Sequence, residues 1–219
     1  MLEVFTTILV KNGQLCWLDA HLNRLWHHAK QIGFSIPPTP FFQERDSKPH
    51  LLRLSINERG YSLKRRDFVP PPAEATVYLS SQIATSQIKT NQRAVYDLAY
   101  QQARKQGAFE GLLLNKDGYL VDGSRSSLFV LKDTSITLLE GGIEGITRQQ
   151  VALQAQKLGF KIKRAYLKPD QIEGQLWLAG TGVGILSVTD SQNLVAQFSS
   201  KKNPIQQRHP QINIARHAQ

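Results

Sequence analysis

Short stretches with the period-two pattern of β-strands alternate with amphipathic stretches of helical period along this chain. Residues 4–10 and 50–57 are rich in Val, Ile, Leu and Thr, which is typical of strands. Residues 18–32, 90–106 and 147–158 carry apolar side chains three and four positions apart, and a glycine follows each stretch, which predicts helices. The alternation predicts a mixed α/β (α+β) protein.

Proline-rich and glycine-rich stretches divide these segments into two unequal parts. Residues 69–81 read VPPPAEATVYLSS, which indicates a stiff connector that runs into another strand. Residues 111–140 predict at least three short strands, and residues 175–188 predict a late strand with a glycine-rich kink. We expect a small N-terminal α/β domain over residues 1–82 and a larger C-terminal domain over residues 83–219.

The chain is basic, with a formal net charge of +10 over 219 residues. Its Lys and Arg residues are scattered, apart from KRR at residues 64–66 and KK at residues 201–202. No aromatic side chains interleave with these clusters as they do in proteins that bind single-stranded nucleic acid. A small anionic substrate explains the charge as well, so we expect no nucleic-acid partner.

Cysteine and histidine usage limits the redox and metal chemistry. Cys16 is the only cysteine, which excludes an internal disulfide and favours a reducing compartment. His21 and His28 stand seven residues apart without a carboxylate at metal-ligand spacing, so we expect no metal. Glu3 and Lys11 argue against a signal peptide, and no apolar run approaches the roughly 20 residues that span a bilayer. We therefore expect a cytoplasmic protein without a membrane contact.

A candidate anion site lies at the predicted start of the third helix. Thr147 and Gln150 have the spacing of a capping box, which predicts that the helix begins at Thr147, and Gly145 permits a tight turn before it. Free N–H groups at a helix start can bind phosphate or carboxylate. An ordinary capped helix explains the same pattern.

Two further features are ambiguous on their own. Residues 179–184 read AGTGVG, where the backbone could approach a ligand closely and Thr181 offers a hydroxyl. Glycines that bend a strand at a packing point would look the same. Arg24 lies on the first helix away from its apolar face, where a solvated arginine is the simple interpretation. Lys89, just before the second helix, could likewise be an ordinary surface lysine.

Three segments together resemble one family. FTTILVKNGQLCWLDAHLNRL, then IKTNQR followed by GLLLNKDGYLVDGSRSSLF, then GITRQQV followed by LWLAGTGVGILSV, are similar in order and spacing to the fold-type IV pyridoxal phosphate enzymes, also called class IV aminotransferases. The similarity leaves out residues 37–80 and the last twenty or so. It implies a two-domain fold like that of D-amino acid aminotransferase, the cofactor pyridoxal 5'-phosphate and a homodimer.

The resemblance assigns a role to each ambiguous feature. Lys89 matches the family lysine that bonds to the cofactor aldehyde and then moves protons, which requires a pKa below the usual value of about 10.4. Arg24 matches the arginine that binds the cofactor phosphate. Ile146 and Thr147 match the backbone donors at the helix start, and Thr181 matches a hydroxyl on the same phosphate.

Asp122 matches the carboxylate that pairs with the pyridine nitrogen, although the family usually has glutamate there. The shorter side chain could cost activity, and a turn residue before Gly123 is the alternative interpretation. Gln92 and Ser127 also replace usual asparagines. Only MLEV precedes FTT, where the family has about 25 to 30 more residues, as strands and a loop would need. We expect a shortened N-terminal part, from a natural short form, a misplaced start or a relative with lost chemistry.

The triplet FTT at residues 5–7 indicates which reaction the resemblance implies. It is similar to aminodeoxychorismate lyases, in which the hydroxyl at the position of Thr7 is thought to favour elimination. We therefore expect a 4-amino-4-deoxychorismate lyase that acts on a small anionic amino-bearing substrate. An aminotransferase for branched-chain or D-amino acids and a non-catalytic relative remain the alternatives.

Overall fold

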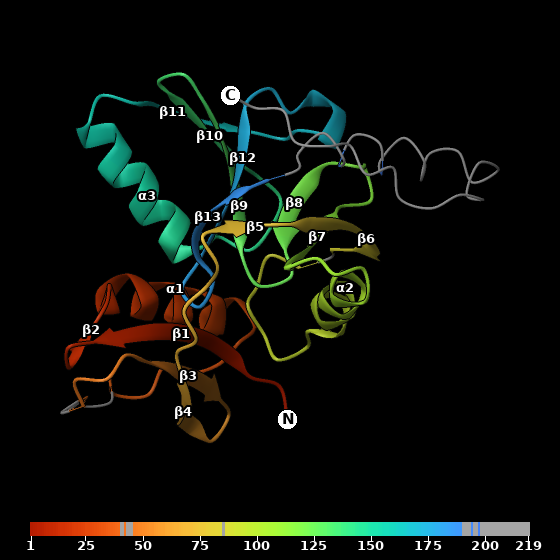
Figure 1. Ribbon diagram of the computed structural model, residues 1–219. Coiled ribbons are helices and arrows are strands. Elements are labelled where there is room, and N and C mark those ends of the chain that lie inside the picture. Colours follow the sequence, from red (N-terminus) through yellow and green to blue (C-terminus); the bar gives the residue numbers. More distant parts are fainter. Residues whose placement is uncertain (40–41, 43–45, 85, 190–193, 195–196, 198–219) are drawn as a thin grey trace.

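The computed structural model describes residues 1–219 except 40–41, 43–45, 85, 190–193, 195–196 and 198–219. Two units are stacked on each other, with the connector of residues 68–73 passing from one to the other (Figure 1). The mixed α/β prediction is confirmed. Within the described part of the chain, no helix has the length and apolar character required to cross a membrane.

The N-terminal unit is an antiparallel sheet with one helix on it. Its strands follow the order β2-β1-β3-β4. Leu22, Leu25 and Ala29 of the helix pack against Val4 and Leu54 of the sheet because these positions alternate to the same face. The elements are β1 (Val4–Lys11), β2 (Gln14–Leu15), α1 (Leu18–Gln31), β3 (His50–Asn57) and β4 (Gly60–Asp67).

The C-terminal unit contains a six-stranded sheet of order β11-β10-β9-β12-β13-β5 and a three-stranded sheet of order β6-β7-β8. Its strands are β5 (Glu74–Ala75), β6 (Val77–Ile83), β7 (Glu110–Leu114), β8 (Leu120–Gly123), β9 (Ser127–Lys132), β10 (Ser135–Leu139), β11 (Lys161–Ala165), β12 (Gln175–Gly180) and β13 (Gly184–Val188). Its helices are α2 (Ala94–Lys105), α3 (Ile146–Lys157) and the short 3-10 helix η1 (Pro169–Gln171).

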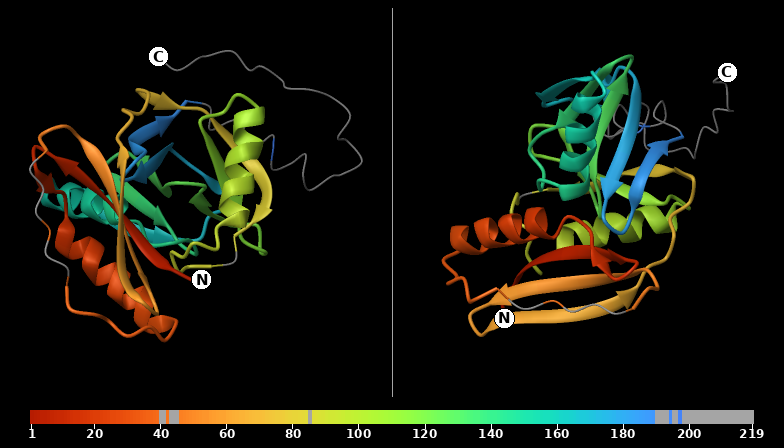
Figure 2. Two further views of the ribbon diagram at one scale, coloured as in Figure 1. Left: turned by 90° about the horizontal axis from the view of Figure 1, so that it is seen from below. Right: turned by 90° about the vertical axis from the view of Figure 1, so that its left-hand side faces the viewer.

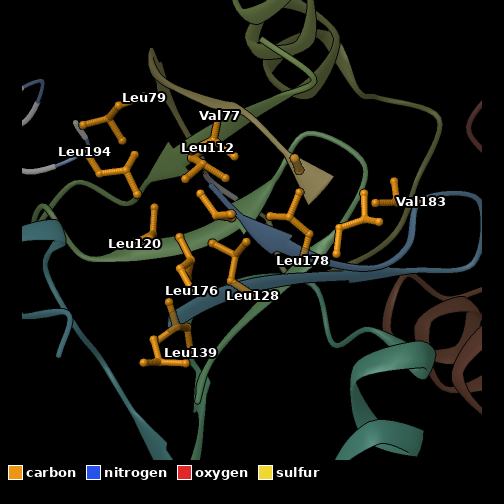
Figure 3. Packing of buried hydrophobic residues seen from close by; sticks show 14 of the residues in the cluster. Val77, Leu79, Leu112, Leu120, Leu128, Leu139, Leu176, Leu178, Val183 and Leu194 are labelled. Atoms are coloured by element: carbon orange, nitrogen blue, oxygen red, sulfur yellow. The ribbon is translucent and has the colours of Figure 1, made fainter. Parts of the chain in front are cut away.

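The main core lies between these two sheets (Figure 3). Leu112 and Leu120 from the smaller sheet meet Leu128, Leu176 and Leu178 from the larger one, and all five are fully buried. Because side chains alternate along a strand, the opposite faces are also apolar and are covered by α2 and α3. Figure 2 shows α3 beside the larger sheet and α2 beside the smaller one.

Strand pairing places the division between the units earlier than the sequence suggested. β5 pairs with β13, and β6 pairs with β7, so both strands belong to the C-terminal unit. The sheets therefore separate between Asp67 and Glu74 rather than at residues 82–83. The prolines at 70–72 end one sheet, but the β-branched run after them joins the other, which composition alone does not reveal.

Two strands and one helix face were not predicted correctly. β4 and β11 are rich in Lys and Arg and lack an apolar alternation, because both are edge strands with solvent-facing side chains. On α2, Leu98 is one of the apolar residues whose helical spacing predicted the helix and its buried face, but its side chain is 45% exposed. Tyr96 is buried instead, since its hydroxyl reaches the buried carboxylate of Asp122.

Candidate active site

A cavity of about 850 Å³ opens between the two units. Its wall combines strands of the N-terminal sheet with the start of α2, the end of β8, the start of α3 and the turn after β12. The structure brings every predicted site residue to this one cavity: Thr7, Arg24, Lys89, Asp122, Ile146, Thr147 and Thr181.

The backbone of Lys89 is fixed to the N-terminal unit although the residue follows the connector in sequence. Its carbonyl accepts a hydrogen bond of 3.0 Å from the Phe5 N–H. Its own N–H donates to Nδ1 of His28 at 3.1 Å. The Asn91 N–H donates to the Glu3 carbonyl at 2.9 Å, which extends the pairing along β1. Lys89 is therefore held in a defined position instead of on a free loop.

The amine of Lys89 has the electrostatic surroundings of a nucleophile. Burial lowers its pKa well below the usual value, and the positive charges of Arg24 and Arg93 lower it further, against the opposing charge of Asp122. An ammonium group without solvent loses hydration energy that nearby cations cannot replace. A larger fraction of the amine is thus unprotonated and able to attack a carbonyl carbon.

The start of α3 differs from the predicted capping box. The helix begins at Ile146 with Gly145 as N-cap, and no side chain caps it. A Cβ on Gly145 would lie 2.3 Å from Oγ of Ser127, so only glycine lets the helix start approach β9 this closely. The cap prediction at Thr147 is therefore wrong. Thr147 lies inside the helix, where its Oγ1 is buried and has no hydrogen-bond partner among the described residues.

Arg24 completes a cradle for an anion. It is not a solvated surface arginine: Nη1 donates to the Glu144 carbonyl and Nη2 to Oγ1 of Thr6, both at 2.9 Å. Its buried Nε has no partner within the described part of the chain. Burial lowers its pKa to about 10, against the opposing charges of Asp122 and Glu144, so the guanidinium stays charged at neutral pH.

The cradle fits a phosphate group. Two buried donors without partners, Nε of Arg24 and Oγ1 of Thr147, lie on the wall of one cavity beside an uncapped helix start. Unsatisfied buried polar groups are costly, and a bound anion would satisfy both. Thr181 lies on the turn after β12 in the same cavity. The residues present therefore suit the phosphate of pyridoxal phosphate.

Sequence reasoning missed the role of the α1 histidines, which it considered only as metal ligands. Oγ1 of Thr6 lies 2.7 Å from Nδ1 of His21 and also accepts from Arg24, which orients the guanidinium. His28 supports Lys89 from the same helix. The spacing of positions 21, 24 and 28 by three and four residues was the available signal, since it places them on one helix face. No cluster of three possible His, Cys, Asp or Glu ligands occurs in the described residues.

His28 must be neutral to accept the Lys89 N–H. Burial lowers its pKa to about 4, and the charge of Arg24 adds to the effect. We predict that His28→Ala lowers the free energy of unfolding by about 1–3 kcal/mol, because a buried N–H loses its acceptor. Urea denaturation of the cofactor-free protein measures this, and His28→Asn should recover part of the loss. His27→Ala at the exposed neighbouring position is the matched control, and an equal effect there would contradict the assignment.

Asp122 is buried at the end of β8. Its Oδ2 accepts a hydrogen bond of 2.7 Å from the Ile143 N–H and a longer one of 3.4 Å from the Tyr96 hydroxyl. Among the described residues none donates to Oδ1, although the side chain lines the cavity. Burial raises the pKa of Asp122 to about 7, against the opposing Ile143 N–H and the charge of Arg148. A positive group next to Asp122 would therefore stabilise the ionised carboxylate.

The raised pKa of Asp122 gives a signed pH prediction for the cofactor-free protein. Between pH 3.8 and about pH 7 the carboxyl of Asp122 is protonated in the folded protein but ionised in the unfolded chain. Its contribution to the free energy of unfolding is therefore fully present below pH 3.8 and is lost as the pH rises through about 7. Relative to Asp122→Asn, the wild type should lose on the order of 2–4 kcal/mol between pH 4 and pH 8. Titrating histidines are common to both proteins and cancel. Parallel stability curves from urea denaturation would refute the assignment.

Thr7 faces the cavity from β1, whereas its neighbour Thr6 points to α1. The register places Thr7 beside Arg53 on β3, and Arg53 beside Lys64 on β4. The catalytic role of Thr7 stays a prediction.

Comparison with known proteins places this cavity in a family context. Residues 57–190 match the family model described as amino-transferase class IV. A solved structure provisionally named 4-amino-4-deoxychorismate lyase is 35% identical, with a TM-score of 0.77 that covers 90% of this chain and 89% of that one. The D-alanine aminotransferase of Bacillus licheniformis is 25% identical over 85% of this chain and 77% of the relative.

Other similar proteins extend less far in sequence or share the fold alone. A solved T.th. branched-chain amino acid aminotransferase complexed with N-(5'-phosphopyridoxyl)-L-glutamate has a TM-score of 0.73 at 20% identity, over 90% of this chain and 84% of that one. The alignments span about a third of the length of the first curated relatives, which are named as branched-chain-amino-acid aminotransferases.

Proposed function

The chain belongs to the amino-transferase class IV family, and from that membership and the cavity described above we propose that it is a pyridoxal phosphate-dependent 4-amino-4-deoxychorismate lyase. The reaction eliminates pyruvate and leaves 4-aminobenzoate, a precursor in folate synthesis. Members of the family are enzymes that use pyridoxal phosphate. The similarity to a provisionally named lyase over most of both chains and the FTT triplet at residues 5–7 support this activity within the family.

One observation carries the proposal. A single cavity holds an amine with a lowered pKa on Lys89, a buried carboxylate with a free oxygen on Asp122, and unpartnered donors on Arg24 and Thr147 among the described residues. A phosphate ester with an aldehyde and a basic ring nitrogen is complementary to all of these groups at once. A purely structural role in the core would explain none of these groups.

Each residue then has a distinct task. Arg24, Thr147, Thr181 and the backbone N–H groups at Ile146 would hold the phosphate. Asp122 would stabilise a protonated ring nitrogen, and that positive charge would favour the ionised form of this buried carboxylate. When bound, the cofactor supplies an aldehyde that takes up the substrate amine and a ring that stores the electron pair released at the adjacent carbon.

Lys89 acts next as the general base. Its unprotonated amine would remove the proton from the substrate carbon that bears the nitrogen, and the carbon–oxygen bond to the enol ether would then break. The leaving enolate takes up one proton and becomes pyruvate, which balances the proton removed from the substrate carbon. The ring that remains is aromatic. The Thr7 hydroxyl on the same wall is our candidate for favouring this elimination over amino transfer.

Incubation of the purified protein with 4-amino-4-deoxychorismate and pyridoxal phosphate tests the activity. We expect 4-aminobenzoate and pyruvate in equal amounts, measured by chromatography. Absence of 4-aminobenzoate from a protein that has taken up the cofactor would reject the lyase and leave the cofactor proposal intact.

An aminotransferase is the second candidate, favoured by the similarity to D-alanine aminotransferase over most of the chain. It predicts stable pyridoxamine phosphate when an amino acid alone is added, which a lyase would not accumulate. A protein that stays colourless with pyridoxal phosphate would favour the third candidate, a non-catalytic relative. We further propose a cytoplasmic homodimer, which light scattering of the purified protein tests for its oligomeric state.

A further inference from the structure

The wall of the cavity that the N-terminal sheet forms is strongly basic. The register of the N-terminal sheet places Leu51 and Arg66 side by side, next to the row of Thr7, Arg53 and Lys64. All five line the cavity, on the sheet face opposite to the one that packs on α1. The only acidic residues on the described cavity wall are Asp67, Asp97 and Asp122.

Most of the arginines on this wall already have a carboxylate partner, but Arg66 does not. Among the described residues, the guanidinium of Arg66 takes part in no ion pair and no hydrogen bond. Arg24 has no carboxylate partner either, but it donates to the Glu144 carbonyl and to Thr6. The partners of the remaining four are Glu3 for Arg53 at 3.6 Å, Asp46 for Arg65, Asp97 for Arg93 at 3.7 Å and Glu110 for Arg125 at 3.2 Å.

Arg66 lies close to the glycine-rich turn of the C-terminal unit. Its guanidinium lies 3.8 Å from the point that a Cβ on Gly182 would occupy, so it lies over the glycine-rich turn beside Thr181. The Arg66 side chain is exposed at the cavity wall, where it still loses part of its hydration. This desolvation lowers its pKa, and the charges of Arg125 and Arg93 lower it further, although it remains protonated at neutral pH. A cation held near other cations without a counter-charge gains from an incoming anion.

We propose that Arg66 binds one carboxylate of the substrate, and that this carboxylate is a different group from any that Arg53 can reach. The site therefore selects amino compounds with two acidic groups. This rests on the proposed function for the reacting amine, but it applies equally to a lyase and to an aminotransferase. Arg66 is thereby a specificity-determining residue.

Binding of simple acids to the wild type and to Arg66→Gln tests the inference. Glutarate carries a carboxylate at each end, and pentanoate has the same chain with one. By isothermal titration calorimetry, the wild type should bind glutarate on the order of tenfold more tightly than pentanoate. This ratio should approach one in Arg66→Gln and recover in part in Arg66→Lys. Arg59→Gln, an exposed change of equal charge outside the cavity, should leave the ratio unchanged.

Each measurement is made on the cofactor-free protein and on protein loaded with pyridoxal phosphate. If the wild type takes up no cofactor, the proposed function fails, while the ratio in the cofactor-free protein still decides the role of Arg66. An unchanged ratio in Arg66→Gln would overturn the inference. So would a matching loss of affinity for pyridoxal phosphate in that variant, because Arg66 would then belong to the phosphate site.

Discussion

Replacement of Lys89 with alanine is expected to abolish covalent attachment of pyridoxal phosphate and to lower turnover by a thousandfold or more, on the order seen when a catalytic nucleophile is removed. No other group on the described cavity wall combines a buried amine with a lowered pKa at a fixed backbone position. Lys89→Arg should be equally inactive, because a guanidinium retains its proton. The absorbance spectrum and the rate of 4-aminobenzoate release measure both effects.

The control for this variant is Lys105→Ala, which removes an exposed lysine at the end of α2. Borohydride reduction of the wild type followed by peptide mapping should place the label on residue 89. A label on Lys64, the second lysine on the cavity wall, would contradict the assignment.

Replacement of Asp122 with asparagine should lower kcat by about a hundredfold to a thousandfold, as the loss of one preorganised charged group does in other enzymes. The amide keeps the size of the side chain but cannot balance a protonated ring nitrogen. Binding of the phosphate end should persist, because Arg24 and Thr147 are untouched. Steady-state kinetics and a cofactor titration separate the two quantities.

The variant Asp122→Glu separates the effect of the negative charge from the effect of side-chain length. It keeps the carboxylate and should retain more activity than Asp122→Asn, but the added methylene enters tight packing: a Cβ on Gly142 would lie only 2.7 Å from Cγ of Asp122. Asp117→Asn in the exposed turn before β8 is the matched control. Equal activity of the wild type and Asp122→Asn would remove Asp122 from the chemistry.

The sequence was sufficient for features that depend on local pattern. The strand at residues 50–57 and the helix that follows Lys89 were recognised from apolar spacing, because buried faces impose that spacing. The family resemblance placed seven residues from distant segments in one site, and all of them line the cavity. Local pattern and family spacing thus predicted which residues share one cavity, while their catalytic roles stay predictions.

What the sequence could not reveal depends on tertiary contacts. Edge strand β4 has no apolar alternation, so Arg66 looked like part of a solvated charge cluster until the register placed it beside Leu51 on the cavity face. The hydrogen bond from the Lys89 N–H to His28 joins residues far apart in sequence. In the sequence, Thr147 has the pattern of a helix N-cap, so its hydroxyl was expected to be bonded to the backbone. The structure shows that Gly145 is the N-cap and that the hydroxyl of Thr147 has no partner among the described residues.

The fixed backbone of Lys89 has a consequence for how the two units work together. The backbone of Lys89 is bonded to β1 and α1, whereas Asp122 lies on β8 and Thr147 on α3 of the C-terminal unit. A hinge rotation between the units would separate the amine from the carboxylate without disturbing either core. Binding of the cofactor should therefore favour one angle between the two units. Because the ligand contacts both units, we expect them to unfold together in a single thermal transition at a higher temperature than in the cofactor-free protein.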